Sequence, residues 1–305
     1  MIPSSKELIH SVHPTPLVEI KKAAVAGCPL YAKLEYFNPY SQSIKDRAAK
    51  VLLDAALSRR PNRIYEASSG NFAIALTLLS NAHGIPVRIY LPKGTPKSTF
   101  SILKILGAEV VSTDFESITP EMVEMVKRDA ERDGALNLNQ FENDLNPLAH
   151  YNGTGKEIVE QLKKERIRPT HLVIGIGTSG TLWGVTRRMR EVEEWKGIKI
   201  IGVQPARGTK IPGIKRIESK PKWLSLVEPD AIVDVSDKEA AIGAAEIARK
   251  EGLPIGLSSG AAYMAYRKIA EVERGIYVTI FPDSIYKYVE KMEELLGGSL
   301  LSTCG

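Results

Sequence analysis

Short apolar segments alternate with helical segments along almost the whole chain. Strand-like apolar segments occupy 30–34, 63–66, 87–91, 172–175, 199–203 and 276–280. Helical periodicity follows most of them, most clearly over 72–83, 97–106, 120–133 and 238–251. Such alternation is typical of strand–helix–strand units, in which neighbouring strands run parallel. The sequence therefore predicts an α/β fold with mostly parallel, twisted sheets flanked by helices.

A polar run interrupts this alternation between Gln140 and Pro147. The chain of 305 residues is long enough for two domains. The segment before the polar run has strands and helices of its own. We therefore predict a larger domain of residues 1–36 plus 141–305, and a smaller domain of residues 37–140.

Composition excludes several classes of protein. The hydrophobic share of 43% and the charged share of 25% are typical of soluble globular proteins. No apolar run approaches the length of a membrane span, and the N-terminus lacks a signal-peptide pattern. The two cysteines, Cys28 and Cys304, are too few for a disulfide framework or a cysteine metal cluster. We expect a cytoplasmic enzyme that works away from membranes.

The net charge of +5 and the pI of about 9.0 would suit an anionic ligand or a nucleic acid. The basic residues are spread along helices beside glutamates, which is typical of a solvated helix face. The pattern therefore favours a protein without a nucleic-acid partner. The five histidines show no metal-ligand spacing, and we expect no metal site.

A glycine-rich loop at 175–181 follows an apolar strand and opens a helix. Its glycines allow a tight turn, and the N–H groups of a helix start favour phosphate, with hydroxyls from Thr178, Ser179 and Thr181. An ordinary strand-to-helix turn is the simpler alternative. The loop lacks the Gly-Lys-Ser/Thr ending of ATP-binding loops. Gln204 stands where an NAD-binding protein would carry an acid, so ATP and NAD are both disfavoured.

Lys45 begins an alanine-rich helical segment. Most lysines at helix starts are simply solvated. Here the positive end of the helix dipole and the nearby Arg47 both lower the pKa of the amine, toward the neutral form that attacks carbonyl groups. Asp46 opposes this shift if it pairs with Lys45 rather than with Arg47, and the sequence leaves that choice open.

Two further segments, 68–71 (Ser-Ser-Gly-Asn) and 256–260 (Gly-Leu-Ser-Ser-Gly), also precede helices. Helix capping alone would explain both. Chemically, the first could bind a carboxylate and direct the amide of Asn71 at a phenolate oxygen. The hydroxyl of Ser258 could face a pyridine nitrogen. An amine, an amide, a phosphate cradle and a hydroxyl are together the groups that hold and steer pyridoxal 5′-phosphate.

These segments together resemble the fold-type II pyridoxal-phosphate enzymes, in the branch of cysteine synthase (O-acetylserine sulfhydrylase) and cystathionine β-synthase. The resemblance covers most of the chain in the family's order, through 13–17 (His-Pro-Thr-Pro-Leu), 43–47 (Ser-Ile-Lys-Asp-Arg), 69–71, 140–141, the glycine loop and 258–260. The chain departs from the family pattern at Phe72-Ala73, where Thr-Gly is usual.

The resemblance implies a role for each matching residue. Lys45 would form the Schiff base with the cofactor. Asn71 would contact the ring oxygen O3′, and Ser258 the ring nitrogen. The 5′-phosphate would be bound by Gly177, Thr178, Ser179, Gly180 and Thr181. The substrate carboxylate would be bound by Ser68, Ser69 and Gln140. The family also implies a homodimer whose smaller domain carries the lysine and closes over the amino-acid substrate.

Two segments, 146–151 and 204–216, look like those of the B-type and O-phosphoserine sulfhydrylases. Lys215 and Arg216 put two cations where related enzymes have an uncharged segment near the substrate pocket. Guanidinium groups match oxyanions through paired hydrogen bonds. We hypothesise that Arg216, together with Lys215, recognises the phosphate of O-phosphoserine or the sulfonate end of thiosulfate. A solvated basic pair is the alternative.

The implied reaction is a β-replacement that makes L-cysteine from O-phosphoserine or O-acetylserine and sulfide, or S-sulfocysteine when thiosulfate is the sulfur donor. A serine/threonine dehydratase or a cystathionine β-synthase-like enzyme is the alternative on the same fold. Dehydratases usually carry an all-glycine phosphate loop, unlike this chain. A non-enzymatic binder is disfavoured by the intact Lys45.

Overall fold

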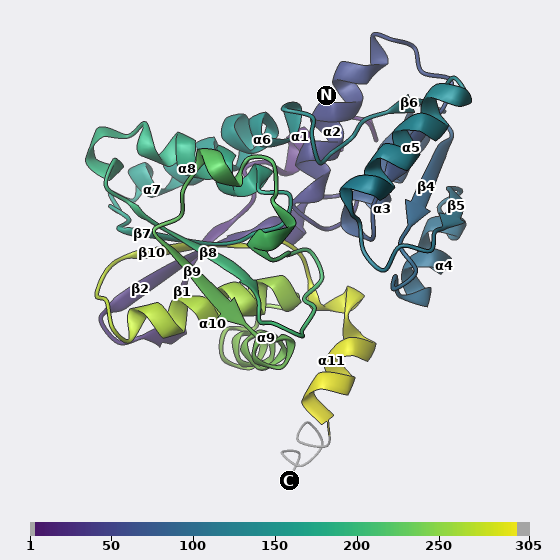
Figure 1. Cartoon of the computed structure of the whole chain (residues 1–305). Coiled ribbons are helices and arrows are strands. Elements are labelled where there is room, and N and C mark those ends of the chain that lie inside the picture. Colours follow the sequence, from purple (N-terminus) through teal and green to yellow (C-terminus); the bar gives the residue numbers. More distant parts are fainter. Residues whose placement is uncertain (1–3, 298–305) are drawn as a thin grey trace. The chain divides into compact units, whose positions relative to one another are not determined.

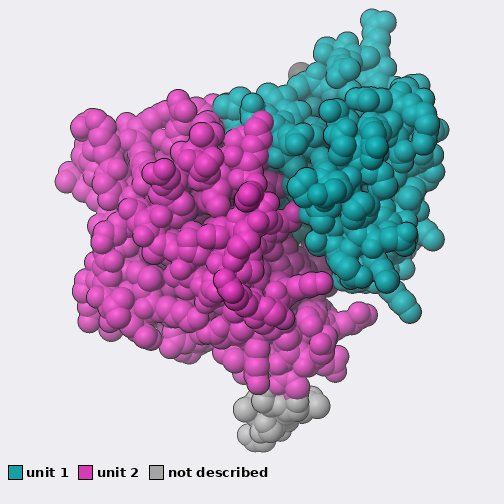
Figure 2. Space-filling model, in the orientation of Figure 1, with its two compact units in different colours: residues 1–13, 38–149 teal, residues 14–37, 150–305 magenta. Residues whose placement is uncertain are grey.

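The computed structural model describes residues 4–297, which form two compact units, coloured separately in Figure 2. Unit 1 comprises the described residues up to His13 together with Asn38–Ala149. Unit 2 comprises Pro14–Phe37 together with the described residues from His150 onward. The units divide after His13, Phe37 and Ala149, so the described residues up to 13 and residues 141–149 lie in unit 1 rather than with the residues predicted for the larger domain. The predicted mobility of the smaller domain stays a prediction.

Unit 1 contains a four-stranded parallel sheet in the order β5-β4-β3-β6 (Figure 1). Its strands are β3 (Ile64–Ala67), β4 (Val87–Leu91), β5 (Glu109–Ser112) and β6 (Leu136–Asn137). Its α-helices are α1 (Leu8–Val12), α2 (Lys45–Leu57), α3 (Asn71–Ala82), α4 (Lys97–Ile105), α5 (Pro120–Arg132) and α6 (Leu145–Ala149).

Strand β3 is buried along its whole length because helices cover both faces of the sheet. Side chains alternate between the two faces of a strand. Ile64 accordingly packs in the cluster that contains α2 and α3, whereas Tyr65 and Ala67 pack against α5. Helices α2 and α3 therefore lie on the face of the sheet opposite α5. Packing on that face positions the first residues of both helices.

Unit 2 contains a six-stranded sheet in the order β1-β2-β10-β7-β8-β9. Its strands are β1 (Leu17–Val25), β2 (Cys28–Leu34), β7 (His171–Gly175), β8 (Lys199–Pro205), β9 (Ala231–Val235) and β10 (Tyr277–Phe281). All neighbouring pairs are parallel except the hairpin of β1 and β2. The predicted fold class, α/β with mostly parallel sheets flanked by helices, is confirmed.

Helices cover both faces of this sheet. Within unit 2, Figure 1 shows α7 and α8 on one face and α9 and α10 on the other. The helices are α7 (Lys156–Lys164), preceded by a π-helical turn (His150–Gly155), and α8 (Gly180–Arg190), α9 (Asp237–Glu251), α10 (Leu257–Ala270) and α11 (Val289–Leu296). Among residues 4–297, no helix has the length and apolar character needed to cross a membrane.

Residues 14–17 of the motif at 13–17 lie at the start of unit 2, and Thr15 is part of a buried network. The hydroxyl of Thr15 donates to Glu35 at 2.8 Å, and its carbonyl accepts from the Lys33 amine at 2.7 Å. That amine also donates to the Glu157 carboxylate at 2.7 Å. A buried cation needs such partners, so Lys33 fixes the N-terminal hairpin to α7.

Candidate active site

Lys45 is the first residue of α2, as the sequence predicts. Its backbone N–H donates to the Ser43 hydroxyl at 3.2 Å. The side chain is half-buried, whereas the next four residues of the helix are buried. The amine therefore sits at the positive end of a helix whose first turn is fixed by packing.

The Asp46 carboxylate accepts hydrogen bonds from the turn before the helix. Its two oxygens accept from the backbone N–H of Tyr40 at 2.7 Å and of Ser41 at 2.9 Å, and the Ser41 hydroxyl also donates to it. Asp46 is fully buried. Asp46 thereby stabilises the 40–43 turn, which directly precedes Ile44 and Lys45.

Ser68, Ser69 and Asn71 lie where β3 ends and α3 begins. The Ser68 hydroxyl accepts from the backbone N–H of Ala73 at 3.1 Å, so part of the predicted capping role is present. Ser69 is exposed and Asn71 is half-buried. Phe72, which departs from the family pattern, packs in the core of unit 1.

Gln140 lies beside the same strand end. Its side-chain amide donates to the carbonyl of Ala67 at 3.2 Å, and its own carbonyl accepts from Asn146 at 2.7 Å. The structure thus brings Gln140 to the residue that directly precedes Ser68. In unit 1, the three residues predicted to bind a carboxylate are close together.

Glu66 is a buried acid at this place that the sequence analysis missed. It is 1% exposed, and its carboxylate accepts from the backbone N–H of Asn139 at 2.9 Å and of Gln140 at 3.4 Å. Burial raises the pKa of Glu66 to about 8, although these backbone hydrogen bonds oppose the rise. The available signal was a charged residue within an otherwise apolar strand.

We expect Glu66 to make unit 1 less stable as the pH rises. Its folded-state pKa of about 8 lies above its ordinary value of 4.5, so the folded state holds a proton that the unfolded state has lost. The contribution of Glu66 to the free energy of unfolding is therefore largest below about pH 4.5. It is lost as the pH rises to about 8. Urea midpoints measured across this window should fall more steeply for the wild type than for Glu66→Gln. Parallel curves would show that Glu66 does not titrate there.

The glycine loop joins β7 to α8 in unit 2, as predicted. Ser179 adopts a left-handed conformation (φ 67°) directly before the helix. The backbone N–H of Gly180 donates to the Thr178 hydroxyl at 3.3 Å. Side chains other than hydrogen would not fit at Gly177, because a Cβ there would lie 2.6 Å from the carbonyl oxygen of Gly213. Close approach to a second backbone segment is thus the reason for that glycine.

Ser258 lies in the first turn of α10 and is 4% exposed. It is close to Gly213, the residue that Gly177 of the glycine loop also approaches. Gly213 has a φ of 87°, and a Cβ on it would lie 3.9 Å from the Ser258 hydroxyl oxygen. Gly213 therefore lies between Gly177 and Ser258. The structure brings together the two predicted cofactor contacts of unit 2.

Two contacts that the sequence analysis missed, one from a backbone N–H and one from a side chain, support the glycine loop. The backbone N–H of Trp223 donates to the Ser179 hydroxyl at 3.0 Å. The Thr181 hydroxyl lies 3.2 Å from Nε2 of His150, which is fully buried. Neither contact can be inferred from the sequence, because the partners are 44 and 31 residues away.

Lys215 and Arg216 differ in their surroundings. The backbone N–H of Lys215 donates to the carbonyl of Ile176 at 2.6 Å, next to the glycine loop, and burial lowers the pKa of the Lys215 amine. The Arg216 guanidinium forms paired hydrogen bonds of 3.1 and 3.0 Å with Glu218 and another of 3.1 Å with Asp234. Arg216 is thus engaged with two carboxylates, and its predicted role as an oxyanion ligand stays a prediction.

The predicted residues are distributed over both units. Unit 1 carries Lys45, Ser68, Ser69, Asn71 and Gln140, and unit 2 carries residues 177–181, Lys215, Arg216 and Ser258. Within each unit the residues have the geometry described above.

Comparison with known proteins gives consistent findings. Residues 8–283 match the family model described as pyridoxal-phosphate dependent enzyme. Cysteine synthase of Aquifex aeolicus is 37% identical over 295 residues, covering 90% of this chain and 88% of that protein. Cysteine synthase B of Salmonella typhimurium is 34% identical, with 90% and 91% covered. The solved O-acetylserine-dependent cystathionine β-synthase of Helicobacter pylori superposes with a TM-score of 0.80 at 27% identity, with 95% and 98% covered.

Proposed function

Because the chain belongs to the family of pyridoxal-phosphate dependent enzymes, in the branch of the cysteine synthases, we propose that it makes L-cysteine by β-replacement on O-phosphoserine or O-acetylserine. The sulfur donor is sulfide, or thiosulfate to give S-sulfocysteine. The observation that carries the proposal is that Lys45, the Ser68–Asn71 segment, the glycine loop and Ser258 each occupy the first turn of a helix or the turn before it.

The residues of unit 2 fit the cofactor. The glycine loop offers backbone N–H groups and hydroxyls at the start of α8, which suits the 5′-phosphate. The buried Ser258 hydroxyl, beside Gly213, suits the uncharged ring nitrogen. Pyridoxal 5′-phosphate, when bound, supplies an electron sink that makes the Cα proton of an amino acid acidic.

The residues of unit 1 perform the proton transfer and hold the substrate. The Lys45 amine removes the proton from Cα as a general base and later returns it. Ser68, Ser69 and Gln140 would bind the substrate carboxylate, and Asn71 would donate to the phenolate oxygen of the cofactor ring. Loss of the Cα proton expels phosphate or acetate from Cβ, where the sulfur nucleophile then forms the new bond.

A direct assay tests the reaction type. We expect L-cysteine to form from O-phosphoserine or O-acetylserine only when sulfide or thiosulfate is added, with loss of the visible colour of the protein when the cofactor is removed. Release of a keto acid from serine or threonine without a sulfur donor would instead identify a dehydratase. Formation of cystathionine with homocysteine would favour the second candidate, which the likeness to the Helicobacter pylori enzyme supports.

We further propose that Lys215 is the cation that recognises a phosphorylated acceptor, while Arg216 holds the 204–218 segment in place. Replacing Lys215 by Met should raise KM for O-phosphoserine roughly 10- to 100-fold, the value of a hydrogen bond to a charged group, and change KM for O-acetylserine little. Arg216→Met is the matched control, and its principal effect should be on stability. If only Arg216→Met loses the preference for the phosphorylated acceptor, Arg216 is the ligand after all.

The enzyme is proposed to act as a homodimer in the cytoplasm, as its resemblance to the family implies. Size-exclusion chromatography with light scattering should give a mass near twice 33.5 kDa. A mass that stays at one chain over the concentration range would contradict the dimer.

A further inference from the structure

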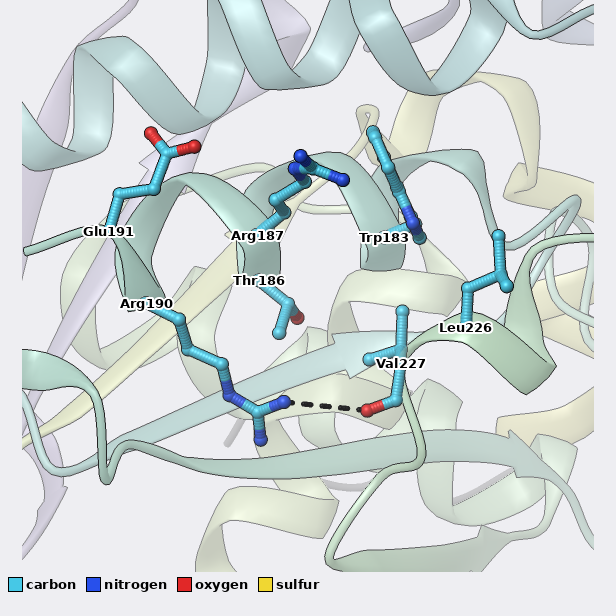
Figure 3. Close-up of a pocket in the computed structure, with 7 residues that line it drawn as sticks. All are labelled: Trp183, Thr186, Arg187, Arg190, Glu191, Leu226 and Val227. Atoms are coloured by element: carbon cyan, nitrogen blue, oxygen red, sulfur yellow. Dashed lines mark hydrogen bonds between the residues drawn. The ribbon is translucent and has the colours of Figure 1, made fainter.

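A hollow lies in unit 2 beside α8, and its lining does not include the glycine loop (Figure 3). Its volume is about 340 Å³, which is within the range of small-molecule sites. Trp183, Thr186, Arg187 and Arg190 lie on one face of the helix, because residues three and four positions apart are neighbours. Leu226 and Val227, from the segment after Trp223, form the opposite wall.

The hollow has an unbalanced cation. Arg187 is exposed, and its guanidinium carbon lies 5.2 Å from the centre of the Trp183 ring. Within residues 4–297, Arg187 forms no ion pair. Glu191, which also lines the hollow, is engaged elsewhere, because its carboxylate pairs with Arg188 at 3.1 Å and accepts from the Tyr151 hydroxyl at 2.7 Å. A planar guanidinium on an aromatic ring is well placed to bind an oxyanion.

Two buried donors in the wall also lack partners. Thr186 is 2% exposed, and within the described chain its hydroxyl makes no hydrogen bond. Nε of Arg190 likewise makes no hydrogen bond within the described chain, whereas its Nη1 donates to the carbonyl of Val227 at 3.5 Å and its Nη2 lies 3.7 Å from the Asp230 carboxylate. Figure 3 shows the Thr186 side chain directed between Arg190 and Val227. An unpaired buried donor destabilises a protein, so an acceptor atom brought by a ligand would be bound favourably.

We propose that this hollow binds a small organic anion, with its oxyanion head between Arg187, Arg190 and Thr186 and its apolar body on Trp183 and Leu226. A carboxylate and a phosphate share this chemistry. The bound anion would bridge α8 and the segment that carries Leu226 and Val227. The site differs from the proposed cofactor site in its residues, and its binding function does not depend on the reaction that the enzyme catalyses.

Both walls of the hollow are connected to the glycine loop. Helix α8 begins at Gly180, within the loop. Leu226 and Val227, the opposite wall, follow Trp223 by three and four residues, and the backbone N–H of Trp223 donates to the Ser179 hydroxyl at 3.0 Å. An anion that draws the two walls together therefore acts on Ser179 from two sides. This coupling rests on the proposed function of the loop as the cofactor phosphate site, and by linkage it must be reciprocal.

Calorimetry on the cofactor-loaded enzyme tests the binding. Benzoate and phenyl phosphate are the probes, and inorganic phosphate represents the head group alone. We expect saturable binding of the aromatic anions, at least tenfold weaker in Arg187→Gln and several-fold weaker in Thr186→Val. Arg207→Gln, an exposed arginine outside the hollow, is the matched control and should bind as the wild type does. Absence of saturable binding, or equal binding by Arg187→Gln and the wild type, would overturn the site.

A second measurement separates the coupling from the binding. The rate of cofactor loss, followed by its visible absorption, should change at least twofold at saturating benzoate in the wild type and not in Arg187→Gln. Binding without such a change would overturn the coupling and leave the site intact. Binding by an enzyme that makes no cysteine would likewise leave the site intact while the proposed function fails.

Discussion

Replacing Lys45 by Ala should abolish cysteine synthesis, with kcat at least about 10³-fold lower on every acceptor. The amine at the start of α2 is the proposed covalent partner of the cofactor and the base for the Cα proton. Hence no other group of the site can replace both functions. Helix α2 should persist, because alanine has the highest helix propensity and the turn before it is held by Asp46. The measurement is steady-state cysteine formation from O-phosphoserine and O-acetylserine with sulfide.

Lys50→Ala is the matched control, because Lys50 lies in the same helix and pairs with the exposed Asp54. We expect this variant to retain wild-type activity. Circular dichroism and the visible absorption of the cofactor show whether each variant is folded and loaded. Undiminished synthesis by a folded Lys45→Ala enzyme would refute the assignment of Lys45 and, with it, the proposed mechanism.

Replacing Gly260 by Ala should strongly destabilise unit 2. Gly260 lies in α10, where this helix packs on α9. A methyl group there would overlap the carbonyl oxygen of Ala240 and lie 2.7 Å from the amide nitrogen of Ala244, so the two helices must separate. Overpacking of this kind typically costs about 1–3 kcal/mol, and clashes with backbone atoms belong at the upper end. The measurement is the midpoint of urea unfolding.

The same change should also weaken cofactor binding, because Gly260 is two residues after Ser258 in the first turn of the helix. Gly197→Ala is the control, since a Cβ at Gly197 has no atom within 4 Å and should leave the midpoint unchanged. If Gly260→Ala unfolded at the wild-type midpoint, the close packing of α9 and α10 described here would be wrong.

The α/β fold could be predicted because its central strands are continuous apolar segments. Strand β1 escaped prediction for a physical reason. Its pairing with β2 shifts register between Ile20 and Val25, and its buried residues, Ile20 and Ala23, are three apart rather than two. A bulge of this kind hides the alternation that identifies a strand. The edge strands β5 and β9 are only half-buried, so their apolar pattern is weak.

For the candidate site, the sequence predicted the features that depend on residues close together in the chain. Lys45, Asn71, the glycine loop and Ser258 are all at helix starts, where a few neighbouring residues determine the backbone. The sequence did not predict interactions between distant segments. Arg216 meets Asp234 across 18 residues, and Glu66 meets the 139–140 segment across more than 70. Such contacts depend on the packing of strands and on burial, which a residue pattern does not reveal.

The pairing of β2 with β10 has a consequence for synthesis on the ribosome. Tyr277 of β10 pairs with Leu30 of β2, and β10 also separates β2 from β7. The sheet of unit 2 therefore stays divided until β10 has been translated, whereas every strand of unit 1 has been synthesised once Asn137 is added. Nascent chains should accordingly acquire a protease-resistant first unit while the N-terminal hairpin still awaits its partner strand.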